Sequence, residues 1–512
     1  MPLLRKGVLI PVKGVDFSTP ATFIDDRSGF PKNMRYLKNE IRKRPGKSLM
    51  GNQTGDALQV MGLGRLELSS TKYLVRASQT KFEKFNTVTN LFESISNTPF
   101  SGNNEDFFHF TTVTEDGLLL LTNGADRIRK WSGSGNAALL GGNPPIAKYL
   151  TYLSPYVLIA HLTVSGDILP WRIDWCETNN PENWSSGNAG SALLSDEPSP
   201  IQNIAKLNEF AAVYKSESLY LGRKVETSEV FRFELIKTGI GLASPRALAE
   251  AEGNHYFMGA NDFYVWNGVR PESIGAVLRD EVFSRINREN IKRCFALHIQ
   301  ELTEVWFFVV IAGYNWPKEV WKYNYRTGYW YFDTCEELTA AIKWERVNTR
   351  SWDDFIGTWN SAQTVWDEGT VVAKWEDIVF GNSLGYCLNL NYETTNDNGV
   401  AVEGWFITKD FTGDQLEFNK RWLQLDVWAR GPGKLFIDYS IDEGSNWTNI
   451  PYTPSQAYID LDGQLRKWEM FFDIIADKIR FRFRNNETGE TFVLRNVYPY
   501  YLAREQIMTR RT

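Results

Sequence analysis

The chain contains 512 residues, enough for two to four domains of ordinary size or for one large repeat domain with an appendage. Apolar residues make up 43% and charged residues 23%, which excludes a wholly disordered chain, a collagen-like fibre and a coiled coil. Lys and Arg number 56 against 62 Asp and Glu, a balance that argues against a generally basic nucleic-acid-binding protein. Any site that depends on basic residues must therefore be a local cluster.

The first 55 residues contain few strand patterns but carry the strongest local charge of the chain. Between residues 27 and 47, eight basic side chains stand against the single acid Glu40. The basic residues are Arg27, Lys32, Arg35, Lys38, Arg42, Lys43, Arg44 and Lys47. We expect residues 1–55 to form an extended basic arm, which either is solvated or contacts nucleic acid or an acidic subunit surface.

Strand patterns dominate residues 56–400, where one unit recurs along the chain. It consists of an apolar strand, a short polar turn and a second strand rich in aromatic residues. Its seven instances pair 72–77 with 81–85, 117–121 with 127–131, 156–162 with 171–175, 209–214 with 218–222, 255–259 with 262–266, 304–311 with 319–325, and 377–380 with 386–390.

The spacing of these units indicates the fold. The first six units start 39 to 53 residues apart, and the seventh starts 73 residues after the sixth. A period of about 40–50 residues is typical of a β-propeller blade with four strands. The sequence therefore favours an all-β fold with a propeller of six to eight blades, seven fitting best, over the alternative of two β-sandwiches with irregular hairpins.

Two stretches interrupt the repeat. Leu278, Val282 and Ile286 recur at four-residue spacing within residues 275–289, which predicts one short amphipathic helix. The second stretch is a Trp-rich insertion near 344–376, where glycines and polar residues favour an irregular loop over a heptad.

The last part of the chain has a different texture. Residues 401–503 contain longer strands in which apolar and polar residues alternate, as in half-exposed sheets that face each other. We expect a separate β-sandwich there, followed by a C-terminal tail at 504–512.

Motifs that resemble catalytic signatures have simpler structural interpretations. The G-x-S-x-G pattern at 381–385 is followed by another strand rather than a helix, so a hairpin turn explains it better than a hydrolase nucleophile. The S-x-D-x-G-x-x-W pattern at 440–447 matches the Asp box of sialidase propellers, whose role is to shape a hairpin. No pair of carboxylates stands out as a glycosidase dyad. The sequence thus indicates no catalytic, cofactor-binding or metal-binding residue, and we expect no enzyme activity.

Cysteine and histidine usage gives the same indication. The chain has four Cys and four His, and none of them has the spacing of a zinc site. We expect the cysteines to be reduced, buried thiols. The N-terminus lacks the apolar core of a secretory signal, and nowhere do about 18 apolar residues run together. We therefore expect a cytosol-like compartment, or export only as part of a larger assembly.

Several short motifs together resemble the tail nozzle proteins of short-tailed bacteriophages, also called tail hub or DNA-stabilisation proteins. The motifs are KGVD at 13–16, LKN at 37–39, RKRPG at 42–46, GLASP at 241–245, YFMG at 256–259, VWNG at 265–268, WKYNYRTGYW at 321–330 and DYSIDEGSNW at 438–447. They are scattered over nearly the whole chain, and each is mostly structural.

The resemblance implies a structural virion protein without catalytic residues or cofactors. Such a protein forms a homohexameric ring below the portal and its adaptor, in the phage tail assembled in the host cytoplasm. The ring acts as a conduit and gate for genome ejection, it touches the phage DNA in its lumen non-specifically, and tail fibres or tailspikes dock on its outside. In that setting the basic residues of 27–47 would contact the adaptor or DNA.

Elementary physics agrees with this role. Each phosphate that Lys or Arg neutralises adds affinity, so a DNA conduit benefits from a net charge such as the −6 of this chain. The 19 Trp, 22 Tyr and 31 Phe could supply aromatic anchors for subunit contacts. Two other classes stay open: a glycan-binding or glycan-cleaving β-propeller protein, and a cytosolic propeller scaffold that displays peptide-binding loops.

Overall fold

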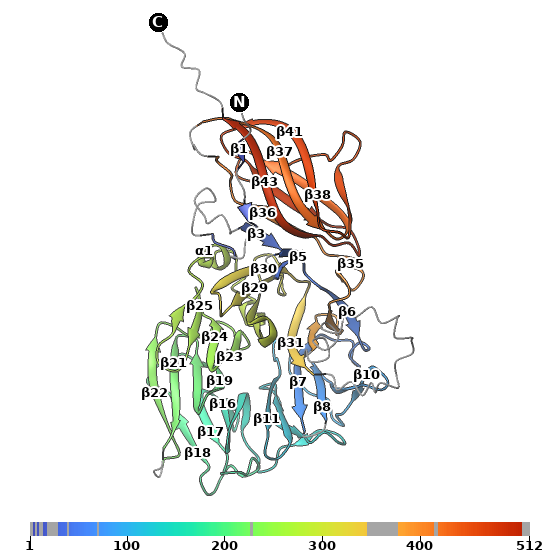
Figure 1. The fold of residues 1–512 in the computed structure, drawn as a ribbon. Coiled ribbons are helices and arrows are strands. Elements are labelled where there is room, and N and C mark those ends of the chain that lie inside the picture. Colours follow the sequence, from blue (N-terminus) through green and yellow to red (C-terminus); the bar gives the residue numbers. More distant parts are fainter. Residues whose placement is uncertain are drawn as a thin grey trace.

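Strand pairing divides the chain into a β-propeller and a β-sandwich (Figure 1). The computed structural model describes residues 4–5, 8–9, 14–17, 29–37, 40–68, 71–225, 229–345, 377–413 and 418–503. Within these ranges the propeller has seven blades, which confirms the predicted fold class. In each blade the first strand lies nearest the propeller axis, where it contacts the first strand of a neighbouring blade.

The first six blades each contain four antiparallel strands in chain order. Blades 1 to 3 comprise β7 (Val60–Glu67), β8 (Lys72–Ser78), β9 (Phe82–Asn86), β10 (Leu91–Ser94); β11 (His109–Val113), β12 (Leu118–Thr122), β13 (Arg129–Trp131), β14 (Ala138–Leu139); and β15 (Ile146–Leu153), β16 (Tyr156–Val164), β17 (Asp167–Trp175), β18 (Gly190–Leu193). Blades 4 to 6 comprise β19 (Ile201–Leu207), β20 (Phe210–Lys215), β21 (Ser218–Lys224), β22 (Phe231–Thr238); β23 (Leu248–Ala251), β24 (Asn254–Met258), β25 (Phe263–Trp266), β26 (Glu272–Ser273); and β27 (Phe295–Ile299), β28 (Glu304–Val309), β29 (Glu319–Asn324), β30 (Tyr329–Thr334).

The seventh blade closes the ring with a strand from the other end of the chain. Its first three strands are β31 (Leu338–Trp344), β32 (Asp377–Asn382) and β33 (Cys387–Asn391). The fourth is β6 (Gly46–Met50), antiparallel to β33. A short hairpin, β34 (Asn396–Asp397) and β35 (Val400–Ala401), then extends this sheet beside β6. Closure by β6 ties the N-terminal segment to the last blade and covers a sheet edge.

The seven sequence repeats correspond to the middle of each blade. Each repeat covers the second and third strands, from β8 and β9 in blade 1 to β32 and β33 in blade 7. These strands are covered on both faces by neighbouring blades, as the buried run Val157–Ala160 in β16 illustrates. Double-sided burial requires continuous apolar runs, which is why the repeats could be recognised.

The sandwich consists of two facing sheets, as predicted for residues 401–503. The first has the order β4 (Met34–Leu37), β5 (Glu40–Lys43), β43 (Val493–Ala503), β37 (Lys420–Arg430) and β41 (Arg466–Ala476), with β1 (Leu4–Arg5) and β2 (Val8–Leu9) also paired to β43. The second has the order β3 (Gly29–Lys32), β36 (Gly404–Thr408), β42 (Arg480–Asn485), β38 (Pro432–Ser440) and β39 (Thr448–Asn449), with β40 (Tyr458–Asp462) paired to β38. Trp422, Leu425, Phe481 and Phe483 lie in the core between the sheets.

The segment expected as an arm over residues 1–55 is part of both domains. Strands β3, β4 and β5 complete the two sheets of the sandwich, whereas β6 completes the propeller. The expectation of a separate arm is therefore corrected for residues 29–50. Their strands are only four or five residues long, and basic side chains alternate with buried ones such as Ile41, so the charge conceals the strand pattern.

Helical structure is sparse among the described residues. The helix predicted within 275–289 is present but shorter, as α1 (Arg279–Phe283), and Leu278, Val282 and Ile286 are buried as expected. Two 3-10 turns follow, at Ile291–Arg293 and Gln300–Leu302. Most of the predicted Trp-rich insertion, 346–376, and the tail at 504–512 lie outside the described residues.

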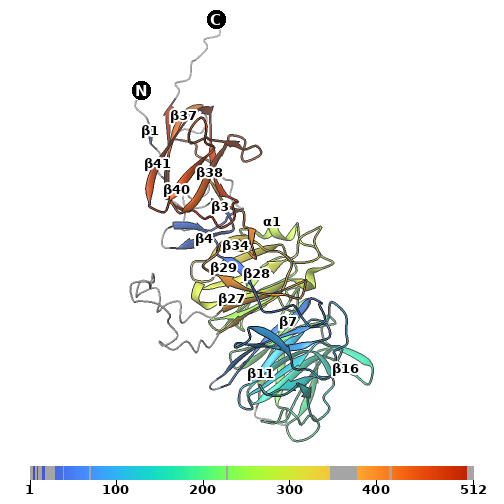
Figure 2. The ribbon, with the colours of Figure 1, turned by 90° about the vertical axis from the view of Figure 1, so that its right-hand side faces the viewer.

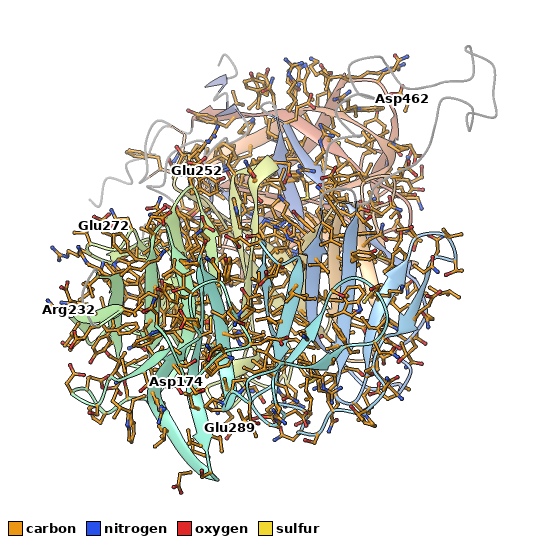
Figure 3. All side chains as sticks on the ribbon, turned by 90° about the horizontal axis from the view of Figure 1, so that it is seen from below. Asp174, Arg232, Glu252, Glu272, Glu289 and Asp462 are labelled. Carbon is orange, nitrogen blue, oxygen red and sulfur yellow. The ribbon has the colours of Figure 1, made fainter. Side chains whose placement is uncertain are left out.

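The sandwich lies against one side of the propeller. Figure 2 shows it above β27, β28 and β29 of blade 6, with β11 and β16 toward the far end of the molecule. The outermost strands of the blades form the rim of the propeller; Figure 3 shows Arg232 of β22 and Glu272 of β26 at this margin.

Candidate functional site at the junction of the two domains

The structure separates the eight basic residues that the sequence predicts to contact an adaptor or DNA. Two lie outside the described residues, namely Arg27 and Lys38. Three are partly exposed, namely Lys32, Arg35 and Arg42. The other three are buried inside this chain, namely Lys43, Arg44 and Lys47. The three buried residues cannot form the predicted external contact in this conformation, because their charged groups are bound by groups of the chain itself.

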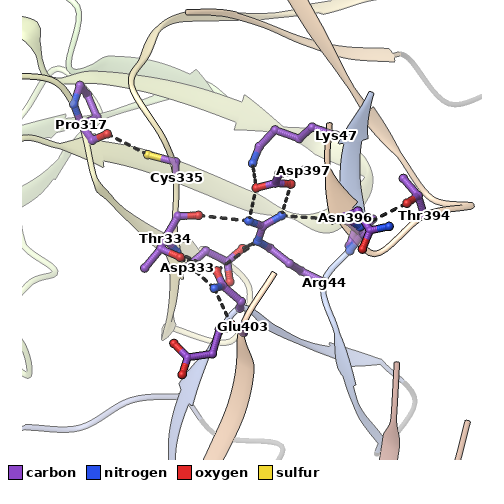
Figure 4. Close-up of polar contacts among 12 residues, drawn as sticks. Arg44, Lys47, Pro317, Asp333, Thr334, Cys335, Thr394, Asn396, Asp397 and Glu403 are labelled. Carbon is purple, nitrogen blue, oxygen red and sulfur yellow. Dashed lines mark hydrogen bonds and ion pairs between the residues drawn. The ribbon is translucent and has the colours of Figure 1, made fainter. Parts of the chain in front are cut away.

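Arg44 and Lys47 share one carboxylate at the boundary between propeller and sandwich (Figure 4). The Arg44 guanidinium makes two parallel bonds to Asp397, 3.0 Å to Oδ1 and 2.7 Å to Oδ2. Lys47 Nζ lies 2.7 Å from the same Oδ2 atom. The pairing of β34 with β6 positions these groups, because it places Asp397 opposite Lys47.

The carboxylate of Asp397 offsets part of the positive charge of Arg44 and Lys47. Burial alone would raise the pKa of Asp397, but the bonds and charges of Arg44 and Lys47 outweigh it and hold the pKa at about 2. Burial, and then the nearby charge of Arg44, lower the pKa of Lys47. A bidentate Arg–carboxylate pair is among the strongest polar contacts, so this cluster is a rigid connection rather than a free basic patch.

Asn33 connects the same cluster to the sandwich. Its Oδ1 accepts hydrogen bonds from Arg44 Nε at 3.1 Å and from the backbone N–H of Thr334 at 2.8 Å. Its Nδ2 donates to the carbonyl of Glu403 at 2.8 Å. Thr334 ends the last strand of blade 6 and Glu403 precedes β36 of the sandwich, so one buried amide joins the two domains.

Lys43 is buried on the sandwich side of the junction, with 2% of its surface exposed. Its Nζ donates to Asn485 Oδ1 at 3.0 Å and to the carbonyls of Glu490 at 3.2 Å and Glu487 at 3.4 Å. Burial, followed by the charge of Arg44, lowers the pKa of Lys43 to about 8. Its hydrogen bonds hold the end of β5 against the loop before β43.

Two of the more exposed basic residues are also engaged within the chain. Lys32 Nζ lies 2.6 Å from the Glu403 carboxylate and 5.9 Å from the ring centre of Trp405. The Arg35 guanidinium lies 5.4 Å from the ring centre of Tyr392. The predicted basic patch is thus distributed around the junction, where Arg44 and Lys47 join the propeller to the segment before the sandwich and Lys43 acts within the sandwich.

A cleft of about 510 Å³ opens between the domains on another side of the junction. Aromatic side chains from both domains line it, among them Trp321 of blade 6 and Trp405 and Trp447 of the sandwich. Its charged groups are paired: Arg285 makes two bonds to Glu319, at 2.6 and 3.3 Å, and Arg480 bonds Asp410 at 2.7 Å. The cleft thus combines apolar walls with neutralised ion pairs.

The two motifs that resemble catalytic signatures are turns, as the sequence predicts. Residues 381–385 connect β32 to β33 as a hairpin. In the Asp-box segment, Asp442 Oδ1 accepts bonds from Ser440 Oγ at 2.7 Å and from the Asn446 backbone at 2.9 Å, which shapes the turn after β38. Over the described ranges, no group of three His, Cys, Asp or Glu side chains is arranged to hold a metal ion. The four cysteines are buried and unpaired, which confirms that prediction.

Sequence reasoning missed the acidic partners of the basic segment. Asp397 lies 350 residues from Lys47 and 353 from Arg44. No local pattern links positions so distant in the sequence. The Asn-Asp-Asn-Gly run around Asp397 predicts only a turn. The pairing follows from ring closure by β6, which brings the two ends of the propeller sequence together.

Comparisons with known proteins give no family. No family model matches the chain, and no curated protein does. Among solved structures, similar chains include PorZ, a surface component of the type-IX secretion system of Porphyromonas gingivalis, with 10% identity, TM-score 0.36, and 79% of this chain and 46% of PorZ covered. The Neurospora crassa Pan2 WD40 domain has 8% identity and TM-score 0.38, with 69% of this chain and 97% of that domain covered.

A third similar structure is the extracellular domain of a putative hybrid two-component system from B. thetaiotaomicron, with 10% identity and TM-score 0.38 over 79% of this chain and 47% of that one. This chain therefore spans about half the length of PorZ and of the third structure. The fold assignment rests on the strand pairing of the chain itself. No helix in the described part is long and apolar enough to span a membrane.

Proposed function

We propose that this chain is a structural subunit of the tail nozzle ring of a short-tailed bacteriophage, below the portal and its adaptor. The sequence motifs that resemble the nozzle family support this proposal, together with a rigid two-domain body and separate apolar surfaces suited to subunit contacts. The alternative is a glycan-binding or glycan-cleaving propeller. That function would need a set of sugar-binding or catalytic side chains, whereas a ring subunit needs only contact surfaces.

The observation that carries the proposal is a pair of exposed apolar surfaces, on β41 and on β17 and β18, strands that lie at opposite ends of the molecule (Figure 1). At the sandwich end, β41 exposes 67% of Phe471 and also presents Ile475. At the far end, β17 and β18 of blade 3 expose 66% of Ile168 and also present Leu193. A ring of identical copies needs two different contact surfaces on each subunit, because each interface is heterologous.

The outer face around Phe471 has the composition of a contact surface. Gln424 of β37 is paired with Phe471 of β41 on one side and with Tyr500 of β43 on the other. Trp428 lies four residues further along β37. Trp428 and Tyr498 pack edge to face at 5.1 Å. Aromatic side chains surrounded by polar groups are enriched in protein interfaces, and such anchors dominate their binding energy.

The junction supports a load-transmitting role. Contacts of Asp397 and of buried Asn33 join propeller and sandwich, so the two contact surfaces belong to one body. The net charge of −6 suits a subunit whose ring surrounds DNA without retaining it. In this proposal the homohexamer, the adaptor and the tail fibres or spikes are the partners, and the virion is the location.

The test is the mass of the purified chain by light scattering, alone and mixed with the portal and adaptor proteins of the same phage. We expect a ring of about six copies that forms with the adaptor, and loss of that ring in the variant Phe471→Ser, since a truncated anchor costs about 2 kcal/mol or more. The control Val88→Ser removes a lone exposed apolar side chain from the turn after β9, so it should assemble normally. A chain that stays monomeric with every virion partner would contradict the proposal.

A further inference from the structure

One sheet of the sandwich ends in a long strand with an open edge. Strand β41 is the last strand of its sheet, and in the described part of the chain only β37 pairs with it. It has 11 residues, whereas the outermost strands of the first six blades have two to eight. No backbone hydrogen bond outside this pairing involves β41 in the described ranges. Its other edge therefore presents backbone N–H and C=O groups that can pair with a further strand.

The core of the sandwich is incompletely covered along this edge. Three side chains of β41 that pack against the core, Trp468, Phe472 and Ile474, are only partly buried. Leu425 and Val427, which belong to the same core on the neighbouring strand β37, are fully buried. A strand added beside β41 would remove further apolar surface from water, and this burial favours its binding.

The outward side chains of β41 form a row of distinct chemistry. Lys467, Glu469 and Phe471 stand at alternate positions, so they lie on the same face of the sheet. All three are exposed, Phe471 to 67%. Lys467 forms an ion pair with Glu469 and lies 3.6 Å from Asp426 of β37. The row thus offers a cation, an anion and an apolar ring, in this order along the strand.

A bulge limits the part of the edge that a partner can use. Trp422 pairs with Ile474 whereas Gln424 pairs with Phe471, so β41 carries one extra residue between these two pairs. Such a bulge interrupts regular pairing at an edge. A partner strand therefore has to match the regular part of β41, which is Arg466–Phe471.

From these features we propose that β41 binds an extended segment of a partner protein as an added antiparallel strand. The antiparallel direction continues the pairing of β37 with β41. The outward row determines the chemistry of the segment, because residues directly opposite each other interact across strands. From its N-terminus the segment places an apolar residue opposite Phe471, a basic residue opposite Glu469 and an acidic residue opposite Lys467, at every second position.

This inference adds a mode of binding to the proposed contact surface around Phe471. It rests on the proposed function only for the identity of the partner, which would be a virion protein. Contact through side chains alone would leave the edge of β41 unpaired, whereas strand addition pairs it and fixes the register. Binding of an isolated peptide does not require a ring, so the two proposals can fail separately.

The test is binding of a synthetic peptide to the full chain, measured by fluorescence anisotropy. The probe is fluorescein-labelled Thr-Val-Thr-Lys-Thr-Glu-Thr, which carries an apolar, a basic and an acidic residue in the expected order. We expect saturable binding with a Kd on the order of 10–100 µM, as for a short strand held by a few hydrogen bonds of modest net strength.

Two isomers of the probe test whether its backbone is paired. One is N-methylated at the odd positions and the other at the even positions. In an antiparallel ladder each residue directs its N–H and C=O to the same side, and successive residues alternate between the two sides. One isomer should therefore lose binding, because its methyl groups face β41, and the other should keep it.

Reversal of one charge tests the register. Glu469→Lys should weaken binding of the probe about fivefold, and a second peptide with glutamate in place of lysine should recover the affinity. The matched control is Glu234→Lys on β22, the outermost strand of blade 4. Glu234 is also exposed and lies 3.7 Å from a basic side chain, that of Arg223, so this variant should bind both peptides as the wild type does.

Three results would overturn the proposal. The first is no saturable binding of the probe, or equal binding of the two N-methylated isomers. The second is an equal effect of Glu469→Lys and Glu234→Lys. The third comes from light scattering of the chain without peptide: a dimer that Glu469→Lys dissociates would assign the edge of β41 to a second copy of this chain.

Discussion

Two groups of buried or partly buried cations in this molecule differ in whether a carboxylate lies beside them. At the junction, buried Arg44 and Lys47 share the partly exposed carboxylate of Asp397. At the propeller end, Arg246 has two backbone carbonyls and the ring of Phe107 nearby, and no described carboxylate lies within ion-pair distance of it. The comparison teaches that burial of a cation does not by itself reveal its role. Removing the counter-ion of a buried cation destabilises the fold strongly, whereas a buried cation without a counter-ion already carries an uncompensated desolvation cost.

The largest expected effect comes from breaking the junction. Asp397→Asn leaves Arg44 and Lys47 buried without their carboxylate, so we expect a loss of about 3–5 kcal/mol of unfolding free energy at pH 7. Urea denaturation of the two proteins measures it. Glu403→Gln is the control, because it breaks the more exposed pair with Lys32 and should cost under about 1 kcal/mol.

The same pair gives a pH test with a definite sign. Because the pKa of Asp397 falls from 3.8 to about 2 on folding, its stabilising effect is complete above pH 4 and is lost as the pH falls through 2. The difference between wild type and Asp397→Asn should therefore shrink between pH 4 and pH 2. A constant difference over this range would show that the charge of Asp397 is not what the junction requires.

A smaller effect is expected from Lys43, whose pKa falls from 10.5 to about 8 on folding. Between these pH values the unfolded chain binds more protons than the folded chain, so stability rises with pH, by at most about 1.4 kcal/mol per unit. Lys43→Met should flatten this rise in urea denaturation, since it removes the titrating group.

The control for Lys43 is Lys206→Met, which removes an exposed lysine and should keep the wild-type pH dependence. A rise of equal steepness in Lys43→Met and in the control would contradict the assignment of this titration to Lys43.

The seven blades could be predicted from sequence because their middle strands have a physical signature. Strands such as β16 are covered on both faces and need continuous apolar runs, which recur with the period of the blade. The sandwich was predictable for a related reason, since one face of each strand is buried and alternation results. The number of blades and the C-terminal part of the sandwich follow from these local patterns, whereas its N-terminal strands β3, β4 and β5 do not.

The junction and the surroundings of Arg246 could not be predicted because they depend on distant partners. Strand β6 is five residues long, and its place in blade 7 depends on pairing with β33, far along the chain. The sequence shows the charge of residues 27–47 but not Asp397, which buries part of it. Lys148 and Arg246 belong to different blades, which the sequence does not place relative to one another.

The smallest expected effect tests the comparison most directly. Replacing a lysine by methionine should change the free energy of unfolding in opposite directions in the two regions. Lys148→Met removes a partly buried charge that Lys292 repels and keeps the apolar stem, so we expect a gain of about 0.5–1 kcal/mol. Lys47→Met should instead lower stability, since Asp397 loses a buried partner. A loss of stability in Lys148→Met would mean that the chain itself neutralises Lys148, and the two regions would then follow the same rule.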